Sequence, residues 1–176
     1  MEFLSGLGVT TVPATSIIGR LALAVLFGAC IGLDREWRRR AAGLRTHMLV
    51  SLAAATFTVL AAEIYAAARA AHPETSADPL LIIEAVTAGV AFLGAGSIIQ
   101  SRGDVQGMTT GASMWAAGAI GLACGAGHPL IALAALMMTM LILTVVGYIQ
   151  YRLGFNTPPK WKRGPTRLTR TAHPVL

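Results

Sequence analysis

Charged side chains are concentrated in residues 34–46, where five arginines and two carboxylates lie between two long apolar segments. The carboxylates, Asp34 and Glu36, come first, and Arg35 and Arg38 are interleaved with them. Basic residues alone would suffice to keep a short loop on the cytoplasmic side of a membrane. The alternation of acids and bases therefore predicts charge pairs held in a fixed geometry, which indicates a functional site.

Other polar side chains are expected beside these charges. Thr46 and either Thr109 or Thr110 stand where two apolar helices are predicted to begin, so they can cap backbone N–H groups there. Such helix N-termini direct positive dipole ends towards Asp34 and Glu36. Two interpretations stay open: a carboxylate held by arginine and helix N-termini without metal, or a cation held by the acids. The predicted charge cluster at the inner membrane face comprises Asp34, Arg35, Glu36, Arg38, Arg45, Thr46, His47, Thr109 and Thr110.

Two further carboxylates, Glu63 and Glu84, lie within apolar segments, at similar depths from the outer ends of those segments. An ionisable side chain inside a span costs roughly 2.5–3.5 kcal/mol on insertion scales and so indicates function. Near a span end, however, it can also extend to the interface. The residues considered for ion binding are Asp34, Glu36, Glu63 and Glu84. The identity of a metal is not predicted, and no cofactor is expected, with Mg²⁺ kept open.

The sequence holds none of the common catalytic motifs. It has no Walker-type phosphate loop, no H-E-x-x-H and no nucleophile elbow. Ser97, Ser101 and Ser113 have no evident base partner along the chain. We therefore do not expect an enzyme.

The elements that must position these residues are hydrophobic helices. The chain is 55% apolar and only 12% charged, with a mean hydropathy of +0.63, which is typical of a polytopic membrane protein. The predicted fold class is all-α integral membrane, with residues 1–151 as a five-helix transmembrane domain. Residues 152–176 are expected to form a basic, Pro-containing cytoplasmic tail that is disordered. The predicted spans, each near the ~20 residues that a bilayer requires, are 15–33, 48–68, 80–100, 108–126 and 129–151.

The distribution of basic residues predicts the orientation. If residues 34–46 are inside, all of the 14 Lys and Arg except Arg20 and Arg69 fall on the cytoplasmic side. The N-terminus is then outside and the C-terminus inside. The net charge of +6 is explained by the membrane surface, so no nucleic-acid partner is expected.

Glycines predict close helix packing and an internal repeat. Spans one and two resemble spans three and four, which predicts two parallel helix hairpins related by a pseudo-twofold axis. Gly28/Gly32, Gly107/Gly111 and Gly121/Gly125 are spaced i,i+4, as in helices that approach closely. Packing within one chain is the favoured interpretation. Gly121 and Gly125 are also predicted to offer a face for a homodimer.

Four ordered motifs resemble the membrane domain of the MgtC/SapB family. They are Gly32-Leu-Asp-Arg-Glu-Trp-Arg, Ala42-Gly-Leu-Arg-Thr-His-Met-Leu-Val, Phe92-Leu-Gly-Ala-Gly and Gly107-Met-Thr-Thr. The resemblance covers residues 18–147. It implies a multi-pass protein of the bacterial inner membrane with about five spans, linked to magnesium limitation and, in some members, to survival inside host cells and virulence.

The chain departs from the family pattern in two places. Many members continue into a soluble C-terminal domain, whereas only residues 152–176 follow the last span here, so that domain is expected to be absent. Ala85 stands where the family commonly has Gln, next to Glu84, which weakens any transfer of a site through span three.

Two function classes follow. The first, which we favour, is a membrane regulator that acts through helix and loop contacts with the lipid bilayer and other membrane proteins. The alternative is an ion-handling protein, a Mg²⁺ transporter or channel working as a dimer, because Mg²⁺ prefers carboxylate oxygens.

Overall fold

The computed structural model describes residues 10–74, 78, 80–101 and 104–153, and most of them are helical. The predicted tail lies almost wholly outside these residues. A short antiparallel hairpin, in which Ile99 pairs with Gln106, interrupts the helices. In chain order the elements are α2 (Ala14–Trp37), α3 (Leu44–Ala71), α4 (Leu81–Gly96), β1 (Ile99–Ser101), β2 (Asp104–Gln106), α5 (Met108–Gly125), α6 (Pro129–Leu141), η1 (Ile142–Val146) and α7 (Gly147–Arg152).

Each predicted span coincides with a helix, and three of the helices are long and apolar enough to cross a membrane. These three, among the described residues, are Ala14–Trp37, Leu44–Ala71 and Pro129–Gln150. α4 is a shorter apolar helix of 16 residues, and α5 has 18 residues rich in Gly and Ala. The prediction of a mainly helical membrane protein is confirmed, while five spans, their orientation and the repeat stay predictions.

Several helix ends differ from the predicted ones, and α3 extends beyond its predicted span of 48–68 at both ends, from Leu44 to Ala71. Residues 34–37 continue α2 instead of forming a loop, because Asp34 and Arg38 pair one turn apart and support the last turn. The third predicted span reached residue 100, but α4 ends at Gly96. There the N–H of Ser97 turns back to the carbonyls of Leu93 and Gly94, and β1 follows.

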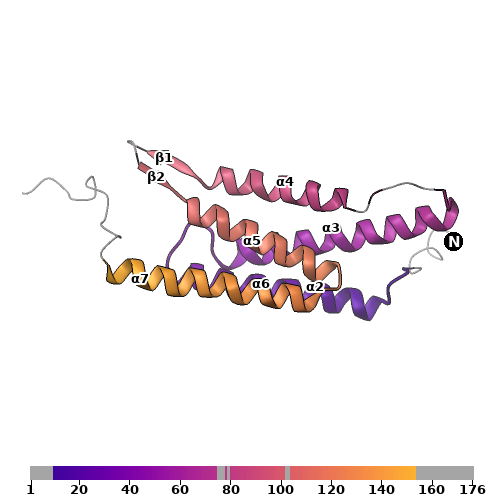
Figure 1. The fold of residues 1–176 in the computed structure, drawn as a ribbon, viewed down its shortest axis with the longest axis horizontal. Coiled ribbons are helices and arrows are strands. Elements are labelled where there is room, and N and C mark those ends of the chain that lie inside the picture. The colour runs from indigo at the N-terminus through magenta and orange to yellow at the C-terminus, as the bar shows by residue number, and fades with distance from the viewer. Residues whose placement is uncertain (1–9, 75–77, 79, 102–103, 154–176) are drawn as a thin grey trace, which may run out of the picture. The chain divides into compact units, whose positions relative to one another are not determined.

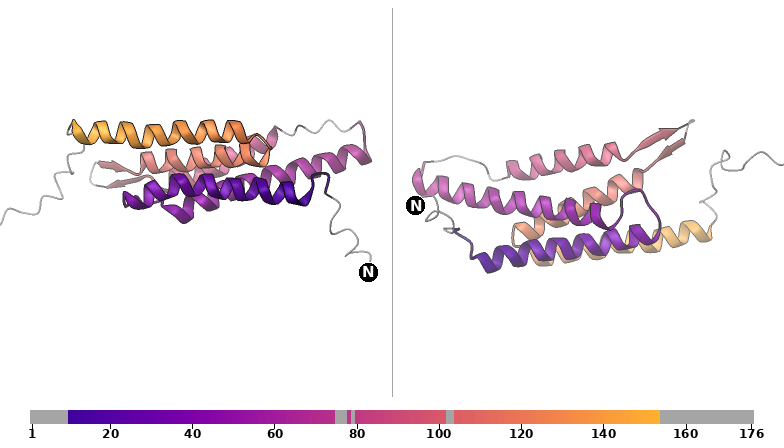
Figure 2. Two further views of the ribbon diagram at one scale, coloured as in Figure 1. Left: turned by 90° about the horizontal axis from the view of Figure 1, so that it is seen from below. Right: turned by 180° about the vertical axis from the view of Figure 1, so that it is seen from behind.

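α5 is the central helix of the first compact unit, which extends to Leu141. It packs against α2, α3, α4 and α6, and ten of its 18 residues are buried (Figure 1). The views in Figure 2 show the connection between α2 and α3 at the end of the bundle where α5 begins. Three chain segments that carry polar residues therefore meet at that end.

Glycines allow the backbones of these helices to touch. A Cβ atom at Gly28 would lie 2.6 Å from the carbonyl oxygen of His47, and one at Gly125 would lie 2.6 Å from that of Ala55. A Cβ at Gly121 would collide with the carbonyl oxygen of Ser51. Tight packing within one chain is thus confirmed for these glycines. The prediction that Gly121 and Gly125 offer a homodimer face is wrong, because α3 already covers both; the homodimer itself stays a prediction.

At the opposite end of the bundle, where α5 ends, two charged side chains bind backbone groups. Glu63 of α3 accepts hydrogen bonds from the N–H of Thr11 at 2.7 Å, the hydroxyl of Thr11 at 2.9 Å and the N–H of Val12 at 3.0 Å. Arg20 of α2 donates to the carbonyl of Gly125 at 3.0 Å, at the C-terminus of α5. Both side chains hold backbone segments in place, as capping groups do.

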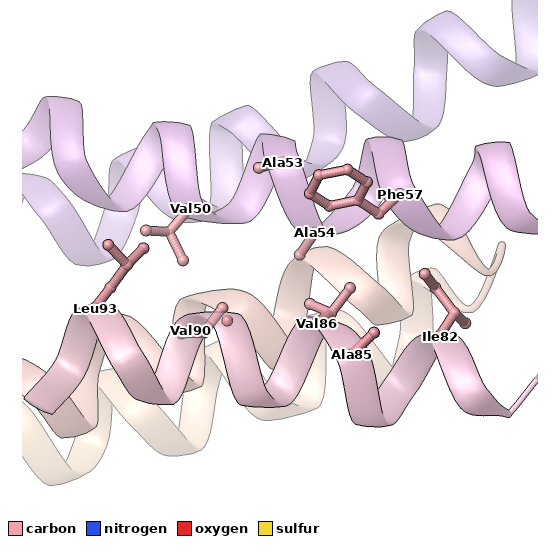
Figure 3. A pocket seen from close by; sticks show the side chains of 10 residues that line it. Val50, Ala53, Ala54, Phe57, Ile82, Ala85, Val86, Val90 and Leu93 are labelled. Atoms are coloured by element: carbon pink, nitrogen blue, oxygen red, sulfur yellow. The ribbon is translucent and has the colours of Figure 1, made fainter.

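α4 is held less completely than the other helices of this unit. Its buried residues are Val86, Val90 and Gly94. An apolar groove of about 340 Å³ separates α4 from α3, with Val50 of α3 near Leu93 of α4 at one end and Phe57 of α3 near Ile82 of α4 at the other (Figure 3). α4 therefore meets α5 along a narrow seam.

The second compact unit begins at Ile142. It contains the π-helical turn η1 and the short helix α7. The guanidinium of Arg152 lies 5.9 Å from the centre of the Tyr148 ring, within range of a cation–π interaction.

Candidate functional site: a buried polar network between α2, α3 and α5

Arg35 is the central residue of the site. It lies in the last turns of α2 and, although charged, is only 3% exposed. Its Nη2 donates to the hydroxyl of Thr110 in the first turn of α5 at 3.2 Å. A buried arginine is rare unless it is paired, so its burial here indicates a built polar site.

His47 extends the network into α3. It is fully buried, with Nδ1 2.8 Å from the carbonyl of Gly43 and Nε2 3.0 Å from the hydroxyl of Ser113. A carbonyl only accepts, so the geometry assigns the hydrogen to Nδ1, which leaves Nε2 of a neutral ring as an acceptor. Ser113 also lies 2.9 Å from the carbonyl of Thr110 and can donate to either group. The Ser113 hydroxyl can therefore switch its hydrogen between His47 and the Thr110 carbonyl.

Three buried polar atoms have no hydrogen-bond partner among the described residues. They are Oδ2 of Asp34, Nε of Arg35 and Oγ of Ser51. A buried polar atom that lacks a partner costs roughly 1–3 kcal/mol, so such atoms call for a functional or structural explanation. All three belong to α2 or α3, on the helices that carry the network.

The two carboxylates of the predicted cluster are engaged separately. Oδ1 of Asp34 pairs with Nε of Arg38 at 2.9 Å. Oε2 of Glu36 accepts the N–H of Leu44 at 3.0 Å and so caps the first turn of α3. A Cβ at Gly43, the residue before that helix, would collide with the Glu36 carboxylate. The predicted pairing of acids with arginine is thus present for Asp34, while Glu36 binds backbone.

The predicted threonine caps are wrong. The N-cap residues of α3 and α5 are Gly43 and Gly107, which have no side chain to cap with, and no threonine hydroxyl takes that role. Thr46 lies inside α3, whose first turn is capped by Glu36, and the hydroxyl of Thr110 accepts from Arg35. The physical reason is that Gly43 and Gly107 occupy the N-cap positions, so the helices begin before the threonines.

Several predicted members lie apart from the network. Arg45 and Thr109 are exposed and form no side-chain hydrogen bond or ion pair within the described part of the chain. Glu63 is at the far end, bound to Thr11, and Glu84 is exposed on α4. The four carboxylates considered for ion binding are therefore not gathered. The described residues also contain no group of three or more His, Cys, Asp or Glu that could hold a metal ion.

Sequence reasoning missed Ser113 and Ser51. Ser113 was expected to lack a base partner, but His47 lies 3.0 Å away. A signal was available, since Thr110 and Ser113 share one face of α5 at i,i+3, and His47 and Ser51 share one face of α3 at i,i+4. Ser113 is 3% exposed, so this Ser–His pair is closed to the surface and works within the protein.

The chain was compared with known proteins, and a model of the MgtC family matches residues 21–152. The chain belongs to the MgtC family. The matched region contains the whole polar network, from Arg35 to Ser113. No solved structure matches the chain.

Three relatives illustrate how this MgtC-family chain compares with longer proteins. It is 34% identical over 134 residues to "Putative magnesium transporter YhiD" of Escherichia coli K12, covering 76% of this chain and 62% of that protein. It is 40% identical over 124 residues to "Protein MgtC" of Salmonella typhimurium LT2, covering 70% and 48%. It is 38% identical over 115 residues to "Protein MgtC" of Brucella abortus 2308, covering 65% and 44%. The alignments thus span 44–62% of the relatives' own lengths.

Proposed function

We propose that this MgtC-family protein is a multi-pass regulator in the bacterial inner membrane that serves adaptation to low magnesium. It acts through contacts of its helices and loops with other membrane proteins, with its N-terminus outside and its C-terminus inside. The observation that carries the proposal is that the buried charge of the site is positive. The polar network is built around Arg35, a cation that is 3% exposed and repels a divalent metal ion.

The state of the carboxylates supports the same function. Mg²⁺ is held by carboxylate oxygens together with several water molecules. Asp34 is paired with Arg38, Glu36 binds the N–H of Leu44, and Glu63 binds backbone at the far end. Mg²⁺ binding by the engaged oxygens of these three side chains would break the interactions, whereas a regulator keeps them and so keeps the shape of its surface.

A Mg²⁺ transporter or channel that works as a dimer is the second candidate. One relative bears the name "Putative magnesium transporter YhiD". Oδ2 of Asp34 is also a buried oxygen without a partner among the described residues. This oxygen is the atom of the network that would suit a cation.

Flux measurements separate the two candidates. The purified protein is placed in liposomes with an entrapped Mg²⁺ indicator, beside protein-free liposomes and liposomes with the Asp34→Ala variant. We expect wild-type protein to carry Mg²⁺ no faster than protein-free liposomes. Flux that Asp34→Ala abolishes would establish the transporter instead.

A complementation experiment tests the regulator directly. Arg35→Met keeps an unbranched apolar stem but removes the guanidinium, and with it the cost of burying a charge whose Nε has no partner among the described residues. In a strain lacking its own MgtC-family protein, Arg35→Met should fail to restore growth at low magnesium while reaching the membrane in normal amounts. Arg69→Met, at the exposed end of α3, is the matched control and should restore growth. Full growth with Arg35→Met would show that the protein does not need the buried network for its function at low magnesium.

A further inference from the structure

The connection between α2 and α3 carries exposed arginines that the buried network does not use. Both carboxylates of this segment are engaged, Asp34 with Arg38 and Glu36 with the N–H of Leu44. Other positive charges on the segment have no carboxylate available within it. Three exposed arginines form no ion pair within the described part of the chain: Arg39, Arg40 and Arg45.

Arg39 occupies a backbone conformation that favours glycine. Its φ is 52°, and it is the one non-glycine residue with positive φ among the described residues. The N–H of Arg40 bonds to the carbonyl of Arg35 and the N–H of Arg39 to that of Glu36, which is the Schellman pattern of a helix end. Glycine is the usual residue at this position because a side chain is strained there. An arginine kept in a glycine position indicates that its side chain is used.

Arg45 also stands where a cation is poorly placed. It is the second residue of α3, at the positive end of the helix dipole, where acidic residues are favoured. It is exposed, so no buried contact explains its presence. An external negative charge would offset the repulsion.

An exposed tryptophan marks the depth of these arginines. Trp37 is the last residue of α2, a helix long and apolar enough to cross a membrane, and it is 87% exposed. Tryptophan at a helix end is characteristic of the membrane–water interface, at the level of the lipid headgroups. The three arginines follow Trp37 within eight residues, so they lie near the same level.

We propose that the headgroup surface, defined as Trp37, Arg39, Arg40 and Arg45, binds the phosphate groups of anionic phospholipids. The indole sits among the headgroups, and the guanidinium groups bind phosphate oxygens, to which their fork of N–H donors is suited. The carboxylates of the segment, Asp34 and Glu36, are already bound to Arg38 and to the N-terminus of α3. The lipid phosphates supply the negative charge for the remaining arginines.

The test measures lipid preference by quenching of Trp37 fluorescence. Trp115 and Trp161 are replaced by Phe so that Trp37 alone reports, and the protein is placed in phosphatidylcholine bilayers. Brominated phosphatidylglycerol or brominated phosphatidylcholine is then titrated, and the ratio of their binding constants is compared between variants. A basic residue near an anionic surface contributes about 1 kcal/mol, so each Arg→Gln change at positions 39, 40 and 45 should lower the ratio about fivefold or less. The triple variant should bring the ratio close to one.

Two variants separate lipid binding from a structural role. Arg39→Gly should lower the phosphatidylglycerol preference as Arg39→Gln does, yet raise the midpoint of thermal unfolding because glycine fits the positive φ. Arg69→Gln removes the same charge at the other end of α3 and should leave the ratio unchanged.

Three results would overturn the proposal. One is a triple variant that keeps the wild-type preference, and another is an equal loss with Arg69→Gln. The third is a loss of the preference when inorganic phosphate is added but not when sodium chloride is added at the same ionic strength. In that case the site would bind free phosphate.

Discussion

The two faces of α5 are packed in different ways. Towards α3, glycines bring backbone against backbone, and buried polar side chains bond across the contact. Towards α4, the backbones touch at Gly94 and Gly111, but further along α5 Gly118 faces the side chain of Val90, and an apolar groove of about 340 Å³ remains between α3 and α4. Backbone contacts and hydrogen bonds fix the position of one helix against another. Apolar side chains beside a groove can repack slightly, so they fix the position less strictly. The difference teaches that backbone contacts and hydrogen bonds hold the α2–α3–α5 group together, while α4, away from its contact at Gly94, is held by apolar side chains alone.

The largest expected effect comes from the α3 side. Gly121→Ala places a Cβ against the carbonyl of Ser51, and a backbone atom cannot move aside without separating the helices. We expect a loss of about 3 kcal/mol or more in the free energy of unfolding, at the upper end of overpacking effects. Unfolding in detergent, together with sedimentation, measures it. A variant of unchanged stability that only loses a dimer would contradict the contact within one chain.

The next effect tests the hydrogen bonds of the same side. His47→Ala empties a fully buried site and removes the bonds to Gly43 and Ser113. The expected loss is about 2–4 kcal/mol, from the cavity and the lost bonds together. His72→Ala, at the exposed C-terminal cap of the same helix, is the control and should be neutral. Equal effects of the two changes would mean that the network contributes nothing to stability.

A smaller effect is expected on the α4 side. Gly118→Ala puts a Cβ 2.9 Å from Cγ2 of Val90, so the contact is with a side chain, which can move aside by a few tenths of an ångström more easily than backbone can. The loss should be about 1 kcal/mol, the low end of overpacking effects. Gly118 and Gly121 lie on the same helix, so this pair is the sharpest test of the comparison. If Gly118→Ala destabilises as much as Gly121→Ala, the two faces of α5 are equivalent and the comparison fails.

The smallest effect is a gain. A Cβ at Gly89 of α4 meets nothing within 4 Å, and the residue lines the groove. Gly89→Ala should stabilise the protein by about 0.5–1 kcal/mol, because alanine is the better helix former. Thermal unfolding of the purified variant checks the sign. Destabilisation would show that the groove closes on Gly89 in the membrane.

Much of the fold follows from the sequence, but less of the site does. Long apolar stretches predict helices at the observed places, and the alternation of acids and bases predicts charge pairs without giving the partners, which for Asp34 is Arg38. The bond from His47 to Ser113 joins residues 66 positions apart, so it depends on how α3 packs on α5. Spacing along the chain gives the face of each helix but not the face it meets. The threonine caps failed for a local reason, since glycines had already begun those helices.

The bond between Arg20 and Gly125 has a consequence for the order in which the protein is made. Arg20 lies on the first described helix, and its carbonyl partner follows 105 residues later. While the ribosome is still producing the intervening helices, the Gly125 carbonyl has not yet been made. The Arg20 guanidinium must then bond to water and lipid headgroups. The first helix therefore takes its final position only after the fourth predicted span, at whose end Gly125 lies, has left the ribosome, so a nascent chain stopped before Gly125 should hold α2 loosely.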